Sequence, residues 1–171
     1  MAIGLRHWRV KGVVQKLLGA LPGGTALNSA LQRQVGELRR PAANFDAKFG
    51  DWQGLMGLLQ AAGRPSVAGL TLVEVGTGWY PTNPILFALA GAHTVHTYDI
   101  TRHLDGTMTR QLVLHLGSKL QAIANVSARP LAEVQEHYQR LCAAREPAAL
   151  LAAAGIVYHA PADAGSTGLA D

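Results

Sequence analysis

One stretch near the middle of the chain constrains the fold most: an apolar run that ends in an acidic, glycine-rich turn. It reads Leu72-Val73-Glu74-Val75-Gly76-Thr77-Gly78-Trp79-Tyr80-Pro81. The apolar part predicts a parallel strand covered by helices on both faces, and the glycines allow a sharp turn at its end. Roughly 20 residues further on, His93 to Asp99 predict a second strand that delivers one carboxylate at its carboxyl end. This arrangement is typical of cofactor-binding α/β sheets.

Strand and helix patterns alternate along the chain from Gly69 onward. Short apolar runs predict strands at Leu70–Val75, His93–Asp99 and Ile156–Ala160. Amphipathic segments between these runs predict helices. Alternation of this kind indicates an α/β fold with a parallel sheet and right-handed crossovers. We therefore expect the first three strands of a Rossmann-like, doubly wound sheet.

The helices between the strands are predicted from periodicity and from the positions of proline. Thr82 or Asn83 can cap a helix that has Pro84 in its first turn. Apolar residues at steps of three and four predict one helix over residues 112–123 and another over residues 131–141. Each of these helices has one apolar face, so each needs the sheet or another helix to cover it.

Residues 1–68 form a predicted helical segment that precedes the sheet. Its third helix places an apolar stripe on one face before Gly63 ends it. The stripe consists of Phe45, Phe49, Trp52, Met56 and Leu59. We therefore divide the chain into an N-terminal helical cap or lid, residues 1–68, and a partial cofactor-binding domain, residues 69–171. The first helix carries Trp8 and basic neighbours, and we expect it to pack on the next domain, with an anionic membrane surface as the alternative.

Composition limits the classes of partner. The chain has 171 residues, of which 49% are hydrophobic and 15% charged, and this predicts a globular protein with a core. The net charge of +4 comes from scattered basic residues, so we expect no nucleic-acid partner. The single Cys142 excludes an internal disulfide and a cysteine-based zinc site, which fits a cytoplasmic protein. No apolar run reaches the length of a membrane-spanning helix.

The histidines do not predict a metal site. His93 and His96 lie three residues apart on a predicted strand, and alternation sends their side chains to opposite faces. Metal-ligand spacing is also missing from His103, His115, His137 and His159. We therefore expect no bound metal.

The residues around the glycine turn favour a cofactor without phosphates. A dinucleotide site needs free N–H groups at the start of the following helix. Here Pro81 and Pro84 remove donors, Glu74 adds negative charge, and Pro81 replaces the third glycine of the dinucleotide pattern. S-adenosylmethionine makes different demands, because it carries a positive sulfonium and ammonium, two ribose hydroxyls and no phosphate. Acidic residues at the turn therefore favour S-adenosylmethionine over NAD.

Three acidic positions carry a likeness to a known family. Glu74-Val75-Gly76-Thr77-Gly78 resembles the acidic-x-Gly-x-Gly motif of the class I S-adenosylmethionine-dependent methyltransferases. Asp99 falls where that family places its ribose-binding acid. Asp163 follows the third predicted strand, where the family's acid commonly meets the adenine amino group. The strings from Glu74 to Pro84 and from Asp99 to Leu104 look like a bacterial subgroup of these enzymes.

The likeness covers residues 70–171 and departs from the family at Tyr80, where many members have a third glycine. It implies a Rossmann-like fold with S-adenosylmethionine as the cofactor. The cofactor-binding residues that it implies are Glu74, Gly76, Thr77, Gly78, Asp99, Ile100 and Asp163.

Each assignment has a structural alternative. Gly76 and Gly78 can serve a tight strand-to-helix turn alone. Asp99 can be a helix cap or a surface acid, and the residues around Asp163 also suit an ordinary turn. Trp79 and Tyr80 either form a wall of the cofactor cavity or only pack against the sheet.

We therefore expect a methyltransferase that transfers the cofactor's methyl group to an acceptor oxygen, nitrogen or carbon. The sequence names neither the acceptor nor a catalytic base. The second hypothesis is an NAD- or nucleotide-dependent oxidoreductase, and the third is a non-catalytic helical interaction module.

Only three strands can be placed, and the sequence ends at residues 165–171, where a loop should lead into a fourth. We therefore expect the N-terminal part of such an enzyme, with weak cofactor binding and no turnover by itself. One edge of the strand Leu70–Val75 would then be unpaired, and open edges readily pair with other chains. The alternative is a natural short form completed by a partner chain or a homodimer across that edge.

Overall fold

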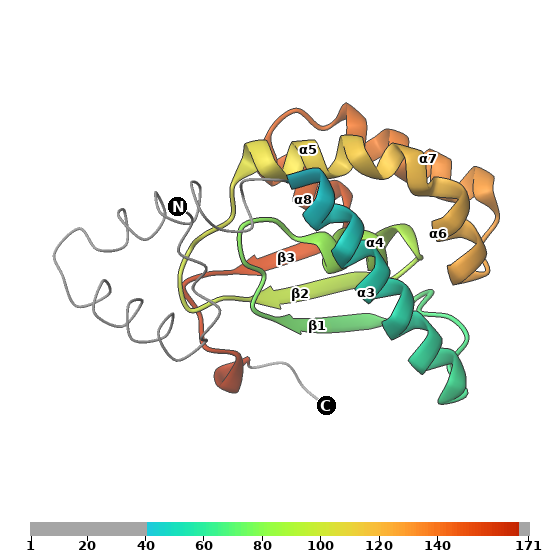
Figure 1. Ribbon diagram of the computed structural model, residues 1–171. Helices are drawn as coiled ribbons and strands as arrows, with labels where there is room; N and C mark the ends of the chain where they lie inside the picture. Colours follow the sequence, from blue (N-terminus) through green and yellow to red (C-terminus); the bar gives the residue numbers. More distant parts are fainter. Residues whose placement is uncertain (1–40, 168–171) are drawn as a thin grey trace, which may run out of the picture. The chain divides into compact units, whose positions relative to one another are not determined.

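The structure is a computed structural model that describes residues 41–167. The two helices predicted before Pro41, with their membrane-surface alternative, lie outside the described residues. From Phe45 onward the chain forms one compact unit. This unit contains nearly all of helix α3 (Pro41–Ala61), followed by a sheet of three parallel strands with helices between them (Figure 1). The predicted α/β fold class is confirmed.

The order of elements follows the predicted alternation. The strands are β1 (Thr71–Val75), β2 (Thr94–Tyr98) and β3 (Ile156–His159). Helix α4 (Thr82–Leu89) connects β1 to β2. The connection from β2 to β3 contains α5 (Gly106–Leu116), the 3₁₀ turn η2 (Gly117–Lys119), α6 (Leu120–Ser127), α7 (Leu131–Ala143) and α8 (Pro147–Ala153). A second 3₁₀ turn, η3 (Ala164–Ser166), follows β3.

The strands lie side by side in the order β1-β2-β3, and both pairs are parallel. In the register of β1 and β2, Glu74 is the partner of Thr97 and Val75 that of Tyr98. This order is the one found in the first half of a Rossmann-type sheet. Within the described residues β1 pairs with β2 alone, so its other edge is open, as the sequence predicted.

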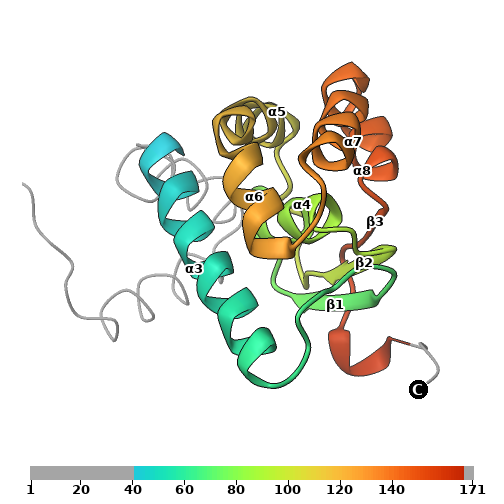
Figure 2. The same ribbon diagram turned by 90° about the vertical axis from the view of Figure 1, so that its right-hand side faces the viewer.

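The helices of both crossovers cover the same face of the sheet (Figure 2). Each crossover moves one strand further in the same direction, and right-handed connections of this kind return on the same side. The opposite face leaves Val73, Val75 and Val157 exposed, with 52%, 71% and 41% of their surface accessible. The sequence predicted helices on both faces of β1. Within residues 41–167 the helices of both crossovers lie on one face only, so this prediction is not confirmed there.

Helix α3 carries the predicted apolar stripe. Its buried side chains are Phe45, Phe49, Trp52 and Met56. The ring of Phe45 meets that of Tyr80 edge-on, with centroids 4.9 Å apart. At the same end of the helix, Asp46 lies 2.9 Å from both His115 and Lys119, and these two hydrogen bonds lower the pKa of Asp46. No helix in the described part of the chain is long and apolar enough to cross a membrane.

The helix predicted over residues 112–123 is interrupted. The structure has α5 and α6 there, joined by the tighter turn η2, which begins at Gly117. A Cβ atom at Gly117 would lie 2.5 Å from Oη of Tyr138, which belongs to α7. Glycine at this position therefore lets α7 approach the backbone closely. The sequence pattern missed the break because the apolar periodicity continues on both sides of it.

Gly155, between α8 and β3, provides a test of this tight packing. Its φ is +66°, and a Cβ atom there would lie 2.8 Å from the backbone oxygen of His93. Gly69 has a similar φ of +75° with nothing within 4 Å of such an atom. We expect Gly69→Ala to lower the free energy of unfolding by about 1 kcal/mol, and Gly155→Ala by at least about 1 kcal/mol more, because only the second adds a clash. Urea denaturation measures both losses, and equal losses would contradict the predicted clash.

Candidate functional site

The glycine turn joins β1 to α4 at the carboxyl edge of the sheet. Gly76 and Gly78 have φ of +86° and +68°, a region that side chains with a Cβ atom rarely occupy. The N–H group of Gly76 donates to the backbone oxygen of Tyr98 at 2.7 Å, which extends the pairing of β1 with β2. A Cβ atom at either glycine would meet nothing within 4 Å. The backbone conformation therefore requires glycine here, and the space beside the turn is open.

Asp99 lies directly beside this turn. Its Oδ2 atom accepts a hydrogen bond from the N–H group of Gly78 at 3.0 Å, and Oδ1 accepts one from Thr101 at 3.3 Å. An ionised carboxylate has about four lone-pair positions, so each oxygen retains acceptor capacity. The structure thus brings the glycine turn and the acid that ends β2 into contact. Both were predicted from separate parts of the sequence.

A chain of hydroxyl groups holds Glu74 in place. The hydroxyl of Thr97 donates to Oε2 of Glu74 at 3.0 Å, and the hydroxyls of Thr77 and Thr97 are hydrogen-bonded to each other. Each hydroxyl has one hydrogen, so Thr77 must be the donor to Thr97. Both threonines are buried, with 4% and 0% of their surface exposed. Glu74 is therefore oriented by groups that water cannot easily replace.

Burial raises the pKa of Glu74. Hydrogen bonds from Thr97 and Asn83 and the positive charge of Lys48 oppose this rise in pKa without cancelling it. Burial disfavours the charged form of a carboxylate, and a nearby positive charge favours it. A cationic group bound next to Glu74 would therefore stabilise its ionised form.

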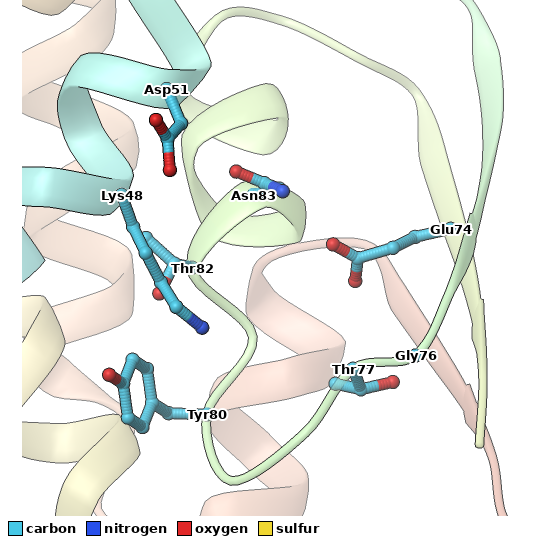
Figure 3. A pocket seen from close by; sticks show the side chains of 8 residues that line it. All are labelled: Lys48, Asp51, Glu74, Gly76, Thr77, Tyr80, Thr82 and Asn83. Carbon is cyan, nitrogen blue, oxygen red and sulfur yellow. The ribbon is translucent and has the colours of Figure 1, made fainter. Parts of the chain in front are cut away.

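A cavity of about 150 Å³ lies beside Glu74 (Figure 3). Charged side chains enter it from two sides: Lys48 and Asp51 from α3, and Glu74 from β1. The remaining lining residues are Gly76, Thr77, Tyr80, Thr82 and Asn83, from the turn and the start of α4. Lys48, Asp51, Thr82 and Asn83 were not predicted as site residues.

The start of α4 differs from the sequence prediction. Pro81 occupies the cap position, no side chain caps the helix, and Thr82 is its first residue. The prediction of Thr82 or Asn83 as the cap is therefore wrong, because the tight turn after Gly78 already brings Pro81 to the helix start. Instead, Oγ1 of Thr82 and Oδ1 of Asn83 are buried without a hydrogen-bond partner in the described part of the chain. Both residues also line the cavity.

The first turn of α4 has few N–H groups to offer an anion. The N–H of Thr82 donates to the oxygen of Tyr80 at 3.0 Å, and that of Ile85 to the oxygen of Pro81 at 3.1 Å. Pro84 has no N–H group at all. Phosphate sites at helix starts depend on such groups being free. The cavity is therefore poorly suited to a phosphate.

Other predicted site residues do not line this cavity. Ile100 is 79% exposed just beyond β2. Asp163 is exposed, and its Oδ1 atom accepts from the N–H group of Gly165 at 2.8 Å, as in the ordinary turn that was the alternative. Its contact with adenine stays a prediction. Tyr80 packs inside the protein and lines the cavity, whereas the ring of Trp79 lies 5.2 Å from that of His103.

Two histidines meet on the uncovered face of the sheet, which the sequence did not predict. Nδ1 of His96 lies 3.0 Å from Nε2 of His159, and the ring centroids are 5.3 Å apart. These separations mean that the two nitrogens point at each other along one line. A zinc ion bound between the two rings would require the nitrogens to lie roughly 4 Å apart, which is twice the usual zinc–nitrogen distance. One ring N–H therefore donates to the other ring nitrogen, and no group of three or more metal-ligating side chains occurs in the described residues.

Comparison with protein-family models, with curated proteins and with solved structures gave no match. The ligand of the site therefore has to be inferred from the geometry and charge of its own residues.

Glu74→Gln tests the effect of burial on this carboxyl group. Because its pKa is raised above the ordinary value of 4.5, its contribution to stability is complete below that pH and is lost as the pH rises through the higher folded value. The Gln side chain has no charge to bury. We expect Glu74→Gln to be more stable than the wild type at about pH 7 and to lose this advantage at about pH 4.

Urea denaturation at the two pH values measures this difference. Glu136→Gln on the exposed side of α7 is the control for replacing an acid that is not buried. A wild-type protein that gains stability relative to Glu74→Gln as the pH rises would contradict the raised pKa.

Proposed function

We propose that the carboxyl edge of β1 and β2 binds S-adenosylmethionine and that the protein is an S-adenosylmethionine-dependent methyltransferase. The observation that carries the proposal is the hydrogen bond between the carboxylate of Asp99 and the N–H group of Gly78. It holds an acid with free acceptor positions against an open glycine turn, at the edge of the sheet where parallel α/β folds bind nucleosides. The buried Glu74 on the neighbouring strand adds a second acid to the same edge.

The residues present fit such a cofactor. The remaining acceptor positions of Asp99 suit the two ribose hydroxyls, and the open space beside Gly76 and Gly78 lets a ligand approach the backbone. Glu74 suits a positively charged group, because a cation beside it offsets the cost of its burial. The cofactor would supply a methyl group that its sulfonium already activates. The protein's part is then to bind, align and shield the reacting groups, and a general base contributes where the acceptor must lose a proton.

The alternatives receive less support from the described residues. A dinucleotide brings a pyrophosphate to the helix start, where Thr82, Pro84 and Ile85 leave few donors. A purely structural module gives no reason for two acids and an open glycine turn to converge on one edge. The open edge of β1 is where we expect a further strand to extend the sheet.

The choice of cofactor is tested by calorimetric and thermal-shift titration of the full chain. We expect S-adenosylmethionine and S-adenosylhomocysteine to bind and to raise the melting temperature, because a ligand specific for the folded state stabilises it. NAD should have a much smaller effect. Stabilisation by NAD together with no response to S-adenosylhomocysteine would overturn the proposal.

The role of Asp99 is tested by two variants. We expect Asp99→Ala to weaken S-adenosylhomocysteine binding about tenfold or more, since charge-assisted hydrogen bonds contribute roughly 1.5–3 kcal/mol and 1.4 kcal/mol is a factor of ten. Asp99→Asn retains an oxygen that can accept from Gly78, so a loss of affinity there comes from the missing charge. Glu136→Gln is the control for a removed surface acid. Wild-type affinity in both Asp99 variants would reduce Asp99 to a residue that fixes the turn.

A further inference from the structure

His96 and His159 form a hydrogen-bonded histidine pair on the face of the sheet that the helices of both crossovers leave uncovered. Nδ1 of His96, on β2, lies 3.0 Å from Nε2 of His159, on β3, and the planes of the two rings differ by 15°. Both side chains are half-buried. In the strand register the partner of His96 is Val157, so His159 lies two positions further along β3 on the same face. The histidine pair therefore connects the two strands near their carboxyl ends.

The ring of Tyr98 lies flat against one face of the His159 ring. The two ring centroids are 4.3 Å apart, and the ring planes differ by 9°. Tyr98 is only 3% exposed, so this stack is shielded from water. A cation over the face of an aromatic ring is attracted to it. The stack therefore favours a positive charge on His159 when the histidine pair takes up one proton.

The surroundings of the histidine pair contain no group that would neutralise two positive charges. On this face the side chains of β1 and β3 beside the pair carry no charge: Thr71, Val73, Val75 and Val157. Tyr98 is the other titratable group of the three strands on this face, because Glu74 alternates to the covered face. The segment after β3 contributes Asp163, which is exposed and accepts from the N–H group of Gly165. In the described part of the chain, no carboxylate oxygen lies within 4.0 Å of a ring nitrogen of either histidine.

The hydrogen bond limits the number of protons that the histidine pair can hold. A neutral imidazole has one N–H donor and one acceptor nitrogen, whereas an imidazolium has two donors. With both rings neutral, or with one ring protonated, one nitrogen donates and the other accepts. With both rings protonated, an N–H group would face an N–H group, and two positive charges would repel each other across the strands. The folded pair therefore accommodates one added proton and disfavours a second.

We infer that the histidine pair is a pH-sensitive switch between the carboxyl ends of β2 and β3, which one added proton strengthens and a second proton opens. Free histidine titrates near pH 6.5, so mild acidification supplies the second proton. The switch lies next to the candidate site, because the N–H group of Asp99 donates to the backbone oxygen of His159 at 2.9 Å. Opening of the pair loosens the strand end that positions Asp99. The inference goes beyond the proposed function and does not depend on which ligand binds there.

NMR spectroscopy of the imidazole nitrogens in the full chain tests the proton count without any variant. His93 is the internal reference, because its side chain is exposed three residues before His96. We expect that, at about pH 6, one ring of the histidine pair is an imidazolium and the other is neutral. The neutral ring should take up its proton only at a lower pH than His93 does. Two rings that titrate together with His93 would overturn the inference.

Urea denaturation of matched variants tests whether the second proton destabilises the fold. We compare the wild type with His96→Gln, with His159→Gln and with the control His93→Gln. Where the unfolded chain binds one proton more than the folded chain, the unfolding equilibrium constant rises about tenfold for each pH unit of acidification. We expect the wild type and His93→Gln to lose stability by about this factor, relative to both pair variants, as the pH falls from about 5.5 to about 4.5. The same pH dependence in all four proteins would contradict the switch.

Amide hydrogen exchange shows where the sheet opens. The N–H group of Asp99 is the local probe, and that of Val95, which donates to the oxygen of Gly155 at 3.0 Å near the other end of β2, is the matched control. After correction for the intrinsic effect of pH, we expect the protection of Asp99 in the wild type to fall between about pH 6.5 and about pH 5 and that of Val95 to change little. Unchanged protection of Asp99, or an equal fall at both amides, would overturn the switch. This measurement and the NMR titration use the wild type, so they decide the question even if a pair variant does not fold.

Discussion

The parallel register of β1 and β2 positions the acidic groups of the candidate site. It sets Glu74 opposite Thr97, whose hydroxyl then orients the carboxylate, and it lets the N–H group of Gly76 bond to the oxygen of Tyr98. That bond carries the pairing into the turn, so Gly78 arrives beside the acid that follows β2. A shift of the register by one residue would turn Glu74 to the uncovered face of the sheet. The site therefore depends on backbone pairing before it depends on any side chain.

Helix α3 completes the cavity because of how its stripe is spaced. Phe45, Phe49 and Trp52 recur at steps of four and three, so they form one buried face. Lys48 and Asp51 each directly precede a member of that stripe, which puts them at its border and not on the far side of the helix. The same packing that buries the aromatic rings thus brings two charges to the start of α4. The burial of the aromatic stripe and the lining of the cavity therefore both depend on how α3 packs.

The sequence predicted those parts of the site that are local in the chain. Gly76, Gly78 and Asp99 lie at strand ends, and the ends of parallel strands meet at one edge whatever the remaining packing. Lys48 was not predicted, because its place in the cavity depends on how α3 meets the sheet. Its position at the edge of an apolar stripe was the available signal, but many solvent-exposed lysines share it.

Two other features depended on geometry that no motif encodes. Thr82 was expected to cap α4, and the path of the turn decided that Pro81 takes that place. His96 and His159 meet across two strands that are far apart in the chain, and their contact follows from the register of β2 and β3. Alternation along one strand says nothing about neighbours on the next strand. Register and turn path are tertiary properties, so local patterns do not determine them.

The scarcity of N–H donors at the start of α4 has a consequence for competition among ligands. Selectivity is a difference between two affinities, and it can be obtained by withholding contacts from the unwanted ligand. Adenosine phosphates contain the same adenosine as the proposed cofactor. A site that recognised adenosine alone would therefore bind them as well. In the proposed site, the start of α4 would offer few N–H donors to the phosphates of such a ligand, and Glu74 and Asp99 would repel them, so only the sugar and the base could form favourable contacts. In the proposed function, Pro81 and Pro84 would therefore disfavour phosphate-bearing ligands by withholding N–H donors from them.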